Sequence, residues 1–244
     1  MSDFSIKSLN CLNKKVINLL RKNQQLEQLI RIELVKDILR KVKLDKNVEE
    51  ILMNKFRKNL KLEDDEDFKK WLSENPFDLE DVKDTAFYKR RFNIFCQENF
   101  AHKIDSRFLD RKKDLDMVVY SLMRISDLFK AKELFYRASE EEEDFGALAA
   151  IHSEGMEKKT RGIVGPIFLE KSHPALTKLL RSSKPGQIQA PIPIEKHFVI
   201  IRVESLDAAK LDDNMRENMV EELFNEWINS QVDELSSKLL EHYN

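Results

Sequence analysis

The chain has 244 residues, of which 41% are hydrophobic and 35% charged, and its formal net charge is −2. This length allows one or two domains, since a domain commonly has roughly 100–200 residues. A mean hydropathy of −0.52, and the lack of any apolar run near 18 residues, exclude a membrane-spanning helix.

Glycine and proline are unevenly distributed. Ten of the eleven lie between residues 146 and 193, and the first 145 residues contain no glycine. Because these two residue types punctuate turns, we expect helices first and a turn-rich segment afterwards. The distribution excludes a uniform all-β chain, a disordered low-complexity chain and a glycine-rich nucleotide-binding loop near the start.

The first 110 residues show the three- and four-residue apolar spacing of amphipathic helices. The spacing predicts five helices, near residues 25–41, 48–60, 64–75, 82–96 and 100–108. The acidic run at 64–67 complements the dipole at the start of the third helix. Pro76 ends that helix, because proline disfavours the helical conformation in the residue before it.

The charge of this region changes sign along the chain. Residues 1–62 carry 15 Lys and Arg against 7 Asp and Glu, whereas residues 63–84 carry 3 against 10. The basic part could contact nucleic acid, an anionic membrane surface or an acidic peptide, or could simply be a solvated helical face. No nucleic-acid partner is expected, because helix-turn-helix, zinc-finger and basic aromatic-strand signals are missing.

From Asp116 onward the pattern is mixed. The expected elements are strands at 117–125, 162–169 and 198–203 and helices at 128–135, 145–151, 173–181 and 219–235. Ser126 is the expected N-cap of the helix at 128–135. Lys184–Gln187 has proline and glycine where a type II turn requires them.

Three stretches of this region occur in a characteristic order: Arg161–Gly165, Lys184–Ile188, and Pro191 followed by Ile200–Val203. Together they resemble the glycine-flanked strand, the turn and the final strand of the parvulin-type (PpiC) peptidyl-prolyl cis-trans isomerases, over residues 116–204. With Phe68–Asn75 and Phe77–Val82 included, the whole chain is similar to the SurA-like arrangement of chaperone helices around a parvulin domain.

The resemblance implies an α+β protein with a helical N-terminal domain at residues 1–114. A small parvulin-like domain follows at residues 115–206, with a four-stranded antiparallel or mixed sheet and flanking helices. The C-terminal helix, at 207–244, is expected to pack back on the helical domain and complete it.

The family surrounds the substrate amide with two histidines, a Cys or Asp, and a Ser or Thr. By position, the histidines correspond to Ser121 and Val199, the Cys or Asp to Gly155 beside Glu154, and the Thr and Ser to Ile194 and Lys196. The polar network is therefore expected to be essentially absent. His197 shares a strand face with Val199 and could partly replace an imidazole, or could be an ordinary polar strand-end residue.

The candidate catalytic positions are Ser121, Glu154, His197 and Val199, and the candidate substrate-binding positions are Met123, Val164, Ser172, Leu176 and Phe198. Ordinary core packing is the alternative for Met123 and Val164. No metal is expected, because no His/Cys/Asp spacing fits a zinc site, and no cofactor is expected.

The expected function is that of a foldase or chaperone acting on a proline-containing or acidic polypeptide client, with weak or lost rotamase activity. The alternative is a non-catalytic escort module that binds peptides through its apolar groove and basic helices. Cys11 and Cys96 are too few for a disulfide framework and are expected as buried thiols. Together with the lack of a signal peptide pattern, they favour a cytoplasmic location.

Overall fold

The computed structural model describes residues 7–243 and divides into two compact units. The helical unit contains the chain up to Ile104 and from Asp213 onward, and the sheet unit contains Asp105–Asp212. The boundaries lie at 104/105 and 212/213 rather than at the expected 114/115 and 206/207. The flanking segments belong to the sheet unit because Arg111 Nη2 pairs with Glu170 at 2.5 Å and the Ala209 N–H donates to Asp116 Oδ1.

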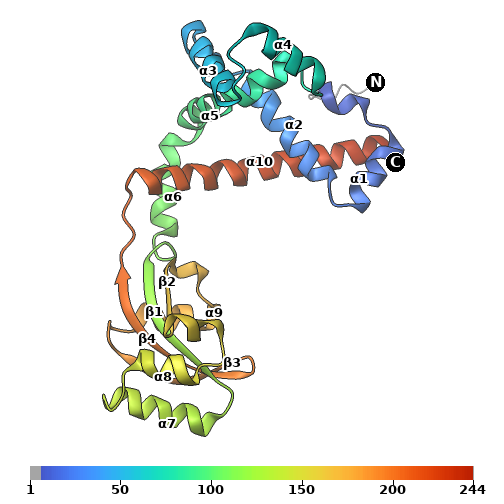
Figure 1. Cartoon of the computed structure of the whole chain (residues 1–244). Coiled ribbons are helices and arrows are strands. Elements are labelled where there is room, and N and C mark those ends of the chain that lie inside the picture. The colour runs from blue at the N-terminus through green and yellow to red at the C-terminus, as the bar shows by residue number, and fades with distance from the viewer. Residues whose placement is uncertain (1–6, 244) are drawn as a thin grey trace. The chain divides into compact units, whose positions relative to one another are not determined.

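The predicted helices of the helical unit are confirmed, and one more is present (Figure 1). They are α1 (Lys14–Lys22), α2 (Leu26–Arg40), α3 (Lys46–Asn59), α4 (Asp65–Glu74), α5 (Leu79–Phe100) and α10 (Asp213–Tyr243), with short 3-10 turns at Lys7–Cys11 and Ala101–Lys103. The acidic runs cap two of them. Asp64 accepts from the N–H groups of the first turn of α4, and Asp78 forms a capping box with Asp81 in α5.

The C-terminal helix returns to the N-terminal helices, as expected. Apolar side chains of α10 pack against α2 and α5 in one buried core, which contains Ile30, Leu34, Phe100, Phe224 and Ile228. The Arg31 guanidinium of α2 donates to the side-chain oxygens of both Asn225 and Asn229 of α10, each at 2.6 Å. These contacts join segments from opposite ends of the chain.

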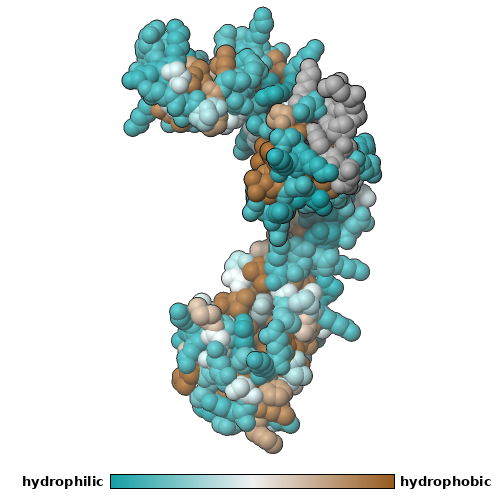
Figure 2. Space-filling view, turned by 90° about the vertical axis from the view of Figure 1, so that its right-hand side faces the viewer, coloured by the Kyte–Doolittle hydropathy of each residue, from teal (hydrophilic) through white to brown (hydrophobic). Residues whose placement is uncertain are grey.

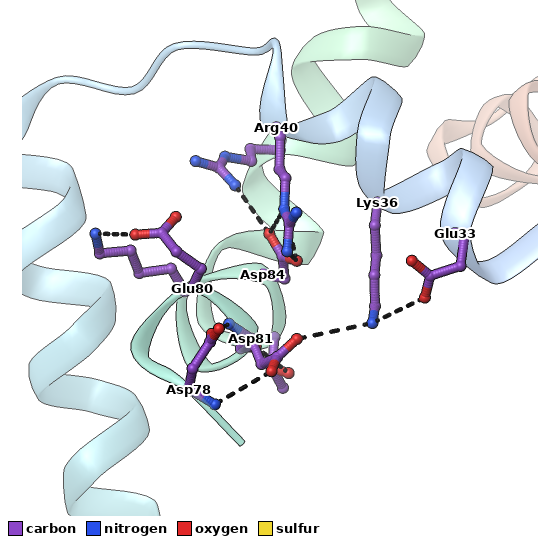
Figure 3. Close-up of polar contacts among 10 residues, drawn as sticks. Glu33, Lys36, Arg40, Asp78, Glu80, Asp81 and Asp84 are labelled. Carbon is purple, nitrogen blue, oxygen red and sulfur yellow. Dashed lines mark hydrogen bonds and ion pairs between the residues drawn. The ribbon is translucent and has the colours of Figure 1, made fainter. Parts of the chain in front are cut away.

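The basic and acidic segments of the sequence neutralise each other where α2 faces α5 (Figure 3). Arg40 binds Asp84 through Nε and Nη2, the latter at 2.6 Å. Lys36 Nζ lies 3.3 Å from Glu33 and 3.9 Å from Asp81. Part of the positive charge of the first 62 residues is therefore neutralised in ion pairs within the helical unit.

The sheet unit begins within α6 (Ile104–Arg111), and its elements occur in the expected order, with one additional strand at Ile188–Ile194 that was not among the expected elements. The elements are β1 (Met117–Ile125), α7 (Leu128–Ser139), α8 (Phe145–His152), β2 (Ile163–Phe168), α9 (Pro174–Ser182), β3 (Ile188–Ile194) and β4 (His197–Asp207), with 3-10 turns at Met156–Thr160 and Leu169–Lys171. The four strands form an antiparallel sheet in the order β2-β1-β4-β3. The predicted fold class is confirmed.

Both faces of this sheet are covered. One face, here called the α9 face, carries Tyr120 and Leu122 of β1 and packs on Leu176 and Leu180. The opposite face, here called the α7/α8 face, carries Met123 and packs on residues such as Leu134 and Leu148. Two buried faces on one strand explain why β1 reads as a continuous apolar run.

Two local predictions are wrong. The N-cap of α7 is Asp127, whose side chain accepts the N–H of Lys130 at 2.7 Å, and not Ser126. Cys11 is exposed, while Cys96 is buried as expected. Cys11 ends a 3-10 turn whose core contact is made by Leu9, so its own side chain is left outside.

The visible surface of both units is largely hydrophilic, with apolar patches separated from one another (Figure 2). Over residues 7–243, no helix combines the length and apolar character that crossing a membrane requires.

Candidate functional site

A small pocket opens on the α9 face of the sheet. Its volume is about 180 Å³, and it is lined by Tyr120, Leu122, Arg124, His173, Leu176, Ile194, Glu195, His197 and Val199. Pockets for whole small molecules usually occupy roughly 300–1,000 Å³. This one has room for a side chain or a single ring.

Strand alternation places the pocket residues. Tyr120, Leu122 and Arg124 are alternate residues of β1, so all three project from the same face. On the neighbouring strand, Val199 is the register partner of Arg124. His197 lies two residues before Val199 and therefore shares its face, as predicted.

His173 is oriented by the helix that it caps. Its Nδ1 accepts the N–H of Ala175 at 3.2 Å, at the start of α9. A ring nitrogen that accepts a hydrogen bond carries no proton, so the neutral imidazole has its proton on Nε2. The cap thus makes the other ring nitrogen of His173 a donor at the pocket.

Tyr120 is another potential donor at the pocket. Its side chain is buried, and burial raises the pKa of the phenol; nearby Arg124 lowers it and Glu157 raises it further. The hydroxyl is therefore protonated at neutral pH. In the described part of the chain it has no hydrogen-bond partner.

A polar network behind the pocket holds Arg124. Its backbone N–H donates to Ser153 Oγ at 3.1 Å, and Ser153 Oγ donates to Glu157 Oε1 at 2.6 Å. The other carboxylate oxygen of Glu157 lies 3.4 Å from Arg124 Nη2. A Cβ added at position 155 would clash with Glu157 Oε2 at a distance of 2.2 Å, so any residue other than glycine there would require the Glu157 carboxylate to move. The Glu157 carboxylate thus occupies the space beside Gly155.

Glu154 lies beside the pocket and contacts His197. It accepts hydrogen bonds from the backbone N–H and the hydroxyl of Ser126, at 3.0 and 2.9 Å. These bonds are the main reason why the pKa of Glu154 lies below its usual value. Its Oε2 is 3.6 Å from Nε2 of His197, so the carboxylate can orient that imidazole.

The structure brings together some predicted site residues and separates others. His197, Val199 and Leu176 line the pocket. Ser121 and Met123 do not, because they lie on the α7/α8 face. Ser121 donates there to Glu204, and Met123 is part of the core under α7 and α8. Neither of these two residues therefore lines this pocket.

Three further substrate-binding predictions have different outcomes. Phe198 packs on the α7/α8 face with Met123 and does not line the pocket. Ser172 is buried outside the lining and donates to the Leu169 carbonyl at 2.6 Å, so its role is to shape the turn before α9. Val164 packs against the apolar core of the α9 face without lining the pocket.

The sequence pattern does not predict that Tyr120, Leu122 and Arg124 line the pocket. Residues 120–123 are all buried, so the alternation that would identify the pocket face is missing from the sequence. The register of β1 against β4 identifies which face of β1 lines the pocket, because Arg124 is the partner of Val199. A register shift between Val119 and Tyr120 makes that register hard to predict from spacing.

No metal centre is found near the pocket. Among the residues that the structure describes, no three His, Cys, Asp or Glu side chains lie close enough together to hold an ion.

Comparison with known families agrees with the fold of the sheet unit. Residues 127–205 match the model of the PPIC-type PPIASE domain, a rotamase family. The sheet unit therefore resembles a parvulin-type peptidyl-prolyl isomerase domain. None of the curated proteins matches the chain.

Several solved structures are similar over most of the chain. The peptidylprolyl isomerase PrsA of Bacillus cereus is 18% identical, with 93% of this chain and 86% of that one covered and a TM-score of 0.49. PrsA of Bacillus anthracis is 19% identical, with coverage of 86% and 94% and a TM-score of 0.44. A SurA-like chaperone of Campylobacter jejuni is 17% identical, with coverage of 82% and 86% and a TM-score of 0.39.

Proposed function

We propose that the pocket binds an X–Pro segment of a polypeptide client and that the chain acts as a foldase or chaperone with weak rotamase activity. The observation that supports this most strongly is the pocket itself, within a domain of the rotamase family. Leu122, Leu176, Ile194 and Val199 give it an apolar wall, and two imidazoles stand beside them.

Prolyl isomerisation requires no covalent chemistry from the protein. The barrier to rotation about a peptide bond is about 18–20 kcal/mol, because the amide is conjugated. An apolar wall can hold the proline ring while donors contact the carbonyl oxygen as the bond twists. His173 Nε2–H and the Tyr120 hydroxyl are candidate donors, and His197 Nε2 lies 3.6 Å from Glu154 Oε2.

The expected activity is weak because most of the family's polar groups have no counterpart here. Val199, at one histidine position, is only 3% exposed and has no donor. Glu157 is already paired with Arg124 and Ser153. His173, His197 and Tyr120 are the remaining polar side chains of the pocket that could contact the twisting amide.

The test is the cis/trans rate of short X–Pro peptides with the wild-type chain and with His197→Ala. His102→Ala is the matched control, since His102 is exposed in the helical unit. We expect a small acceleration over the uncatalysed rate, reduced several-fold by His197→Ala and unchanged by His102→Ala. A kcat/KM within roughly 10⁴–10⁸ M⁻¹s⁻¹, the usual range of enzymes, would overturn the expectation of weak activity.

Binding must be measured separately from rate. X–Pro peptides should shift the NMR signals of Leu176 and Val199, which line the pocket. Peptide binding with no acceleration of the cis/trans rate would favour the alternative, a non-catalytic peptide-binding module. The apolar, buried Val199 supports this alternative because it provides no hydrogen-bond donor. Absence of any shift at saturating peptide would refute both functions for this pocket.

The cytoplasmic location stays a prediction from the low cysteine content. Cell fractionation with an antibody against the chain tests it.

A further inference from the structure

A second groove lies in the helical unit, between α3 and α5. Its volume is about 370 Å³, and it is lined by Leu52, Lys55, Phe56, Asn59, Thr85, Ala86, Lys89, Arg90 and Asn93. The residues of each helix recur at three- and four-residue steps, so each helix contributes one continuous face. The groove follows both helices for about two turns.

The bottom of this α3–α5 groove is apolar and incompletely covered. Leu52, Phe56 and Ala86 are each only partly buried. Although α3 packs against α5, none of its residues is fully buried. The apolar face of α3 is therefore short of packing partners.

The charged residues that line the groove are all basic. Lys55, Lys89 and Arg90 line it, and no carboxylate does. None of the three has an ion-pair partner among the described residues. Arg40 and Lys36 of the same unit are paired with acids of α5. Three cations without an ion-pair partner among the described residues thus lie around the apolar strip formed by Leu52, Phe56 and Ala86.

We propose that the α3–α5 groove docks an acidic polypeptide segment with apolar anchor residues, in the form of a short amphipathic helix. Carboxylates of the ligand would meet Lys55, Lys89 and Arg90, and its aliphatic or aromatic side chains would cover Leu52 and Phe56. A helix lying in an apolar groove uses anchors at this three- and four-residue spacing. Two turns of helix are about 11 Å long, which is close to the span from Leu52 to Asn59.

The apolar strip favours a polypeptide over a nucleic acid. Phosphates would satisfy the three cations but leave Leu52, Phe56 and Ala86 in contact with water. An amphipathic acidic helix satisfies both features. The site is independent of the rotamase pocket, because all its lining residues belong to the helical unit. Failure of one proposal therefore leaves the other intact.

The test is fluorescence anisotropy of a labelled acidic amphipathic peptide with Leu and Phe anchors, titrated with the full chain. The groove variant is Lys55→Glu/Lys89→Glu/Arg90→Glu. The matched control is Lys14→Glu/Lys15→Glu/Lys22→Glu, which makes the same charge change at exposed residues of α1. We expect affinity to fall at least tenfold in the groove variant and less than threefold in the control.

A second variant tests the apolar strip. Leu52→Ala leaves the charge unchanged and should weaken binding several-fold, with the circular dichroism spectrum preserved. Binding should also weaken as salt rises from low to moderate concentration, because exposed charges are screened over about 8–10 Å.

Three results would overturn the proposal. They are equal weakening in the groove and control variants, equal binding of a peptide with Lys in place of Glu, and an unchanged affinity in the groove variant. A DNA duplex that binds the wild type and competes with the peptide would assign the cations to nucleic acid instead.

Discussion

Asp84 is the acid on which two arginines converge, and Asp84→Asn removes its charge while keeping its shape. The Asp84 side chain is only 9% exposed; Arg40 Nη2 lies 2.6 Å from one carboxylate oxygen and Arg91 Nη1 lies 3.6 Å from the other. The Nε atom of Arg91 is buried with no hydrogen-bond partner in the described chain. Neutralising Asp84 would remove the carboxylate charge that both guanidiniums contact.

The size of the effect follows from the geometry. Charges about 4 Å apart interact by about 4 kcal/mol at an effective dielectric constant near 20. Breaking a buried pair from one side costs about 3–5 kcal/mol. Arg40 is 47% exposed and can be resolvated, whereas Arg91 is 12% exposed and cannot. We therefore expect Asp84→Asn to lower the free energy of unfolding of the helical unit by about 3 kcal/mol.

Urea unfolding followed by tryptophan fluorescence measures this change selectively. The chain has 2 tryptophans, Trp71 in α4 and Trp227 in α10, and both belong to the helical unit. The control is Glu66→Gln, which breaks an exposed i,i+3 pair with Lys69 and should cost at most about 0.5 kcal/mol. A loss below about 1 kcal/mol for Asp84→Asn, or one equal to the control, would refute the assignment of a buried charge cluster.

Other expectations concern a thiol, a carboxylate and a helix cap. Burial raises the pKa of Cys96 to about 12, so a thiol reagent at pH 8 should titrate only the exposed Cys11 in the native chain and both cysteines after unfolding. Two reactive thiols in the native chain would contradict the burial of Cys96. The pKa of Glu154 is lowered in the folded state, so its contribution to stability is present above its ordinary value of 4.5 and is lost as pH falls through the lowered value. The stability difference between the wild type and Glu154→Gln should therefore vanish at acid pH, and a difference that grows there would reverse the sign of the shift. Asp127→Ala removes the N-cap of α7 and should destabilise the sheet unit by about 1 kcal/mol, as measured by thermal unfolding, with Asp127→Asn close to the wild type.

Much of the fold could be predicted because its signals are local. The acidic residue Asp64 caps the helix that it precedes. The Lys184–Gln187 turn also has the predicted form: Gly186 has φ +83°, and the Gln187 N–H donates to the Lys184 carbonyl at 3.1 Å. Each of these features needs only a few consecutive residues, so a sequence pattern is enough to identify it.

The pocket could be predicted only in part, because its composition depends on pairing between strands. His197 and Val199 lie on one strand, and alternation placed them together correctly. Which residues of β1 face them depends on a register that contains an irregularity after Val119. A shift of one residue exchanges the two faces of a strand. Ser121, predicted at the site from the family's motif, lies on the opposite face of β1 from Leu122 and Arg124.

The helical unit is assembled from two stretches of sequence, with the sheet unit inserted between them. During synthesis, α2 and α5 leave the ribosome long before α10, which completes their core. Translating residues 105–212 alone takes roughly 5–20 s at about 5–20 residues per second, which is time enough for the sheet unit to fold. Until then the apolar surface that α10 covers on α2 and α5 remains exposed, so the nascent chain is itself prone to aggregation during that interval.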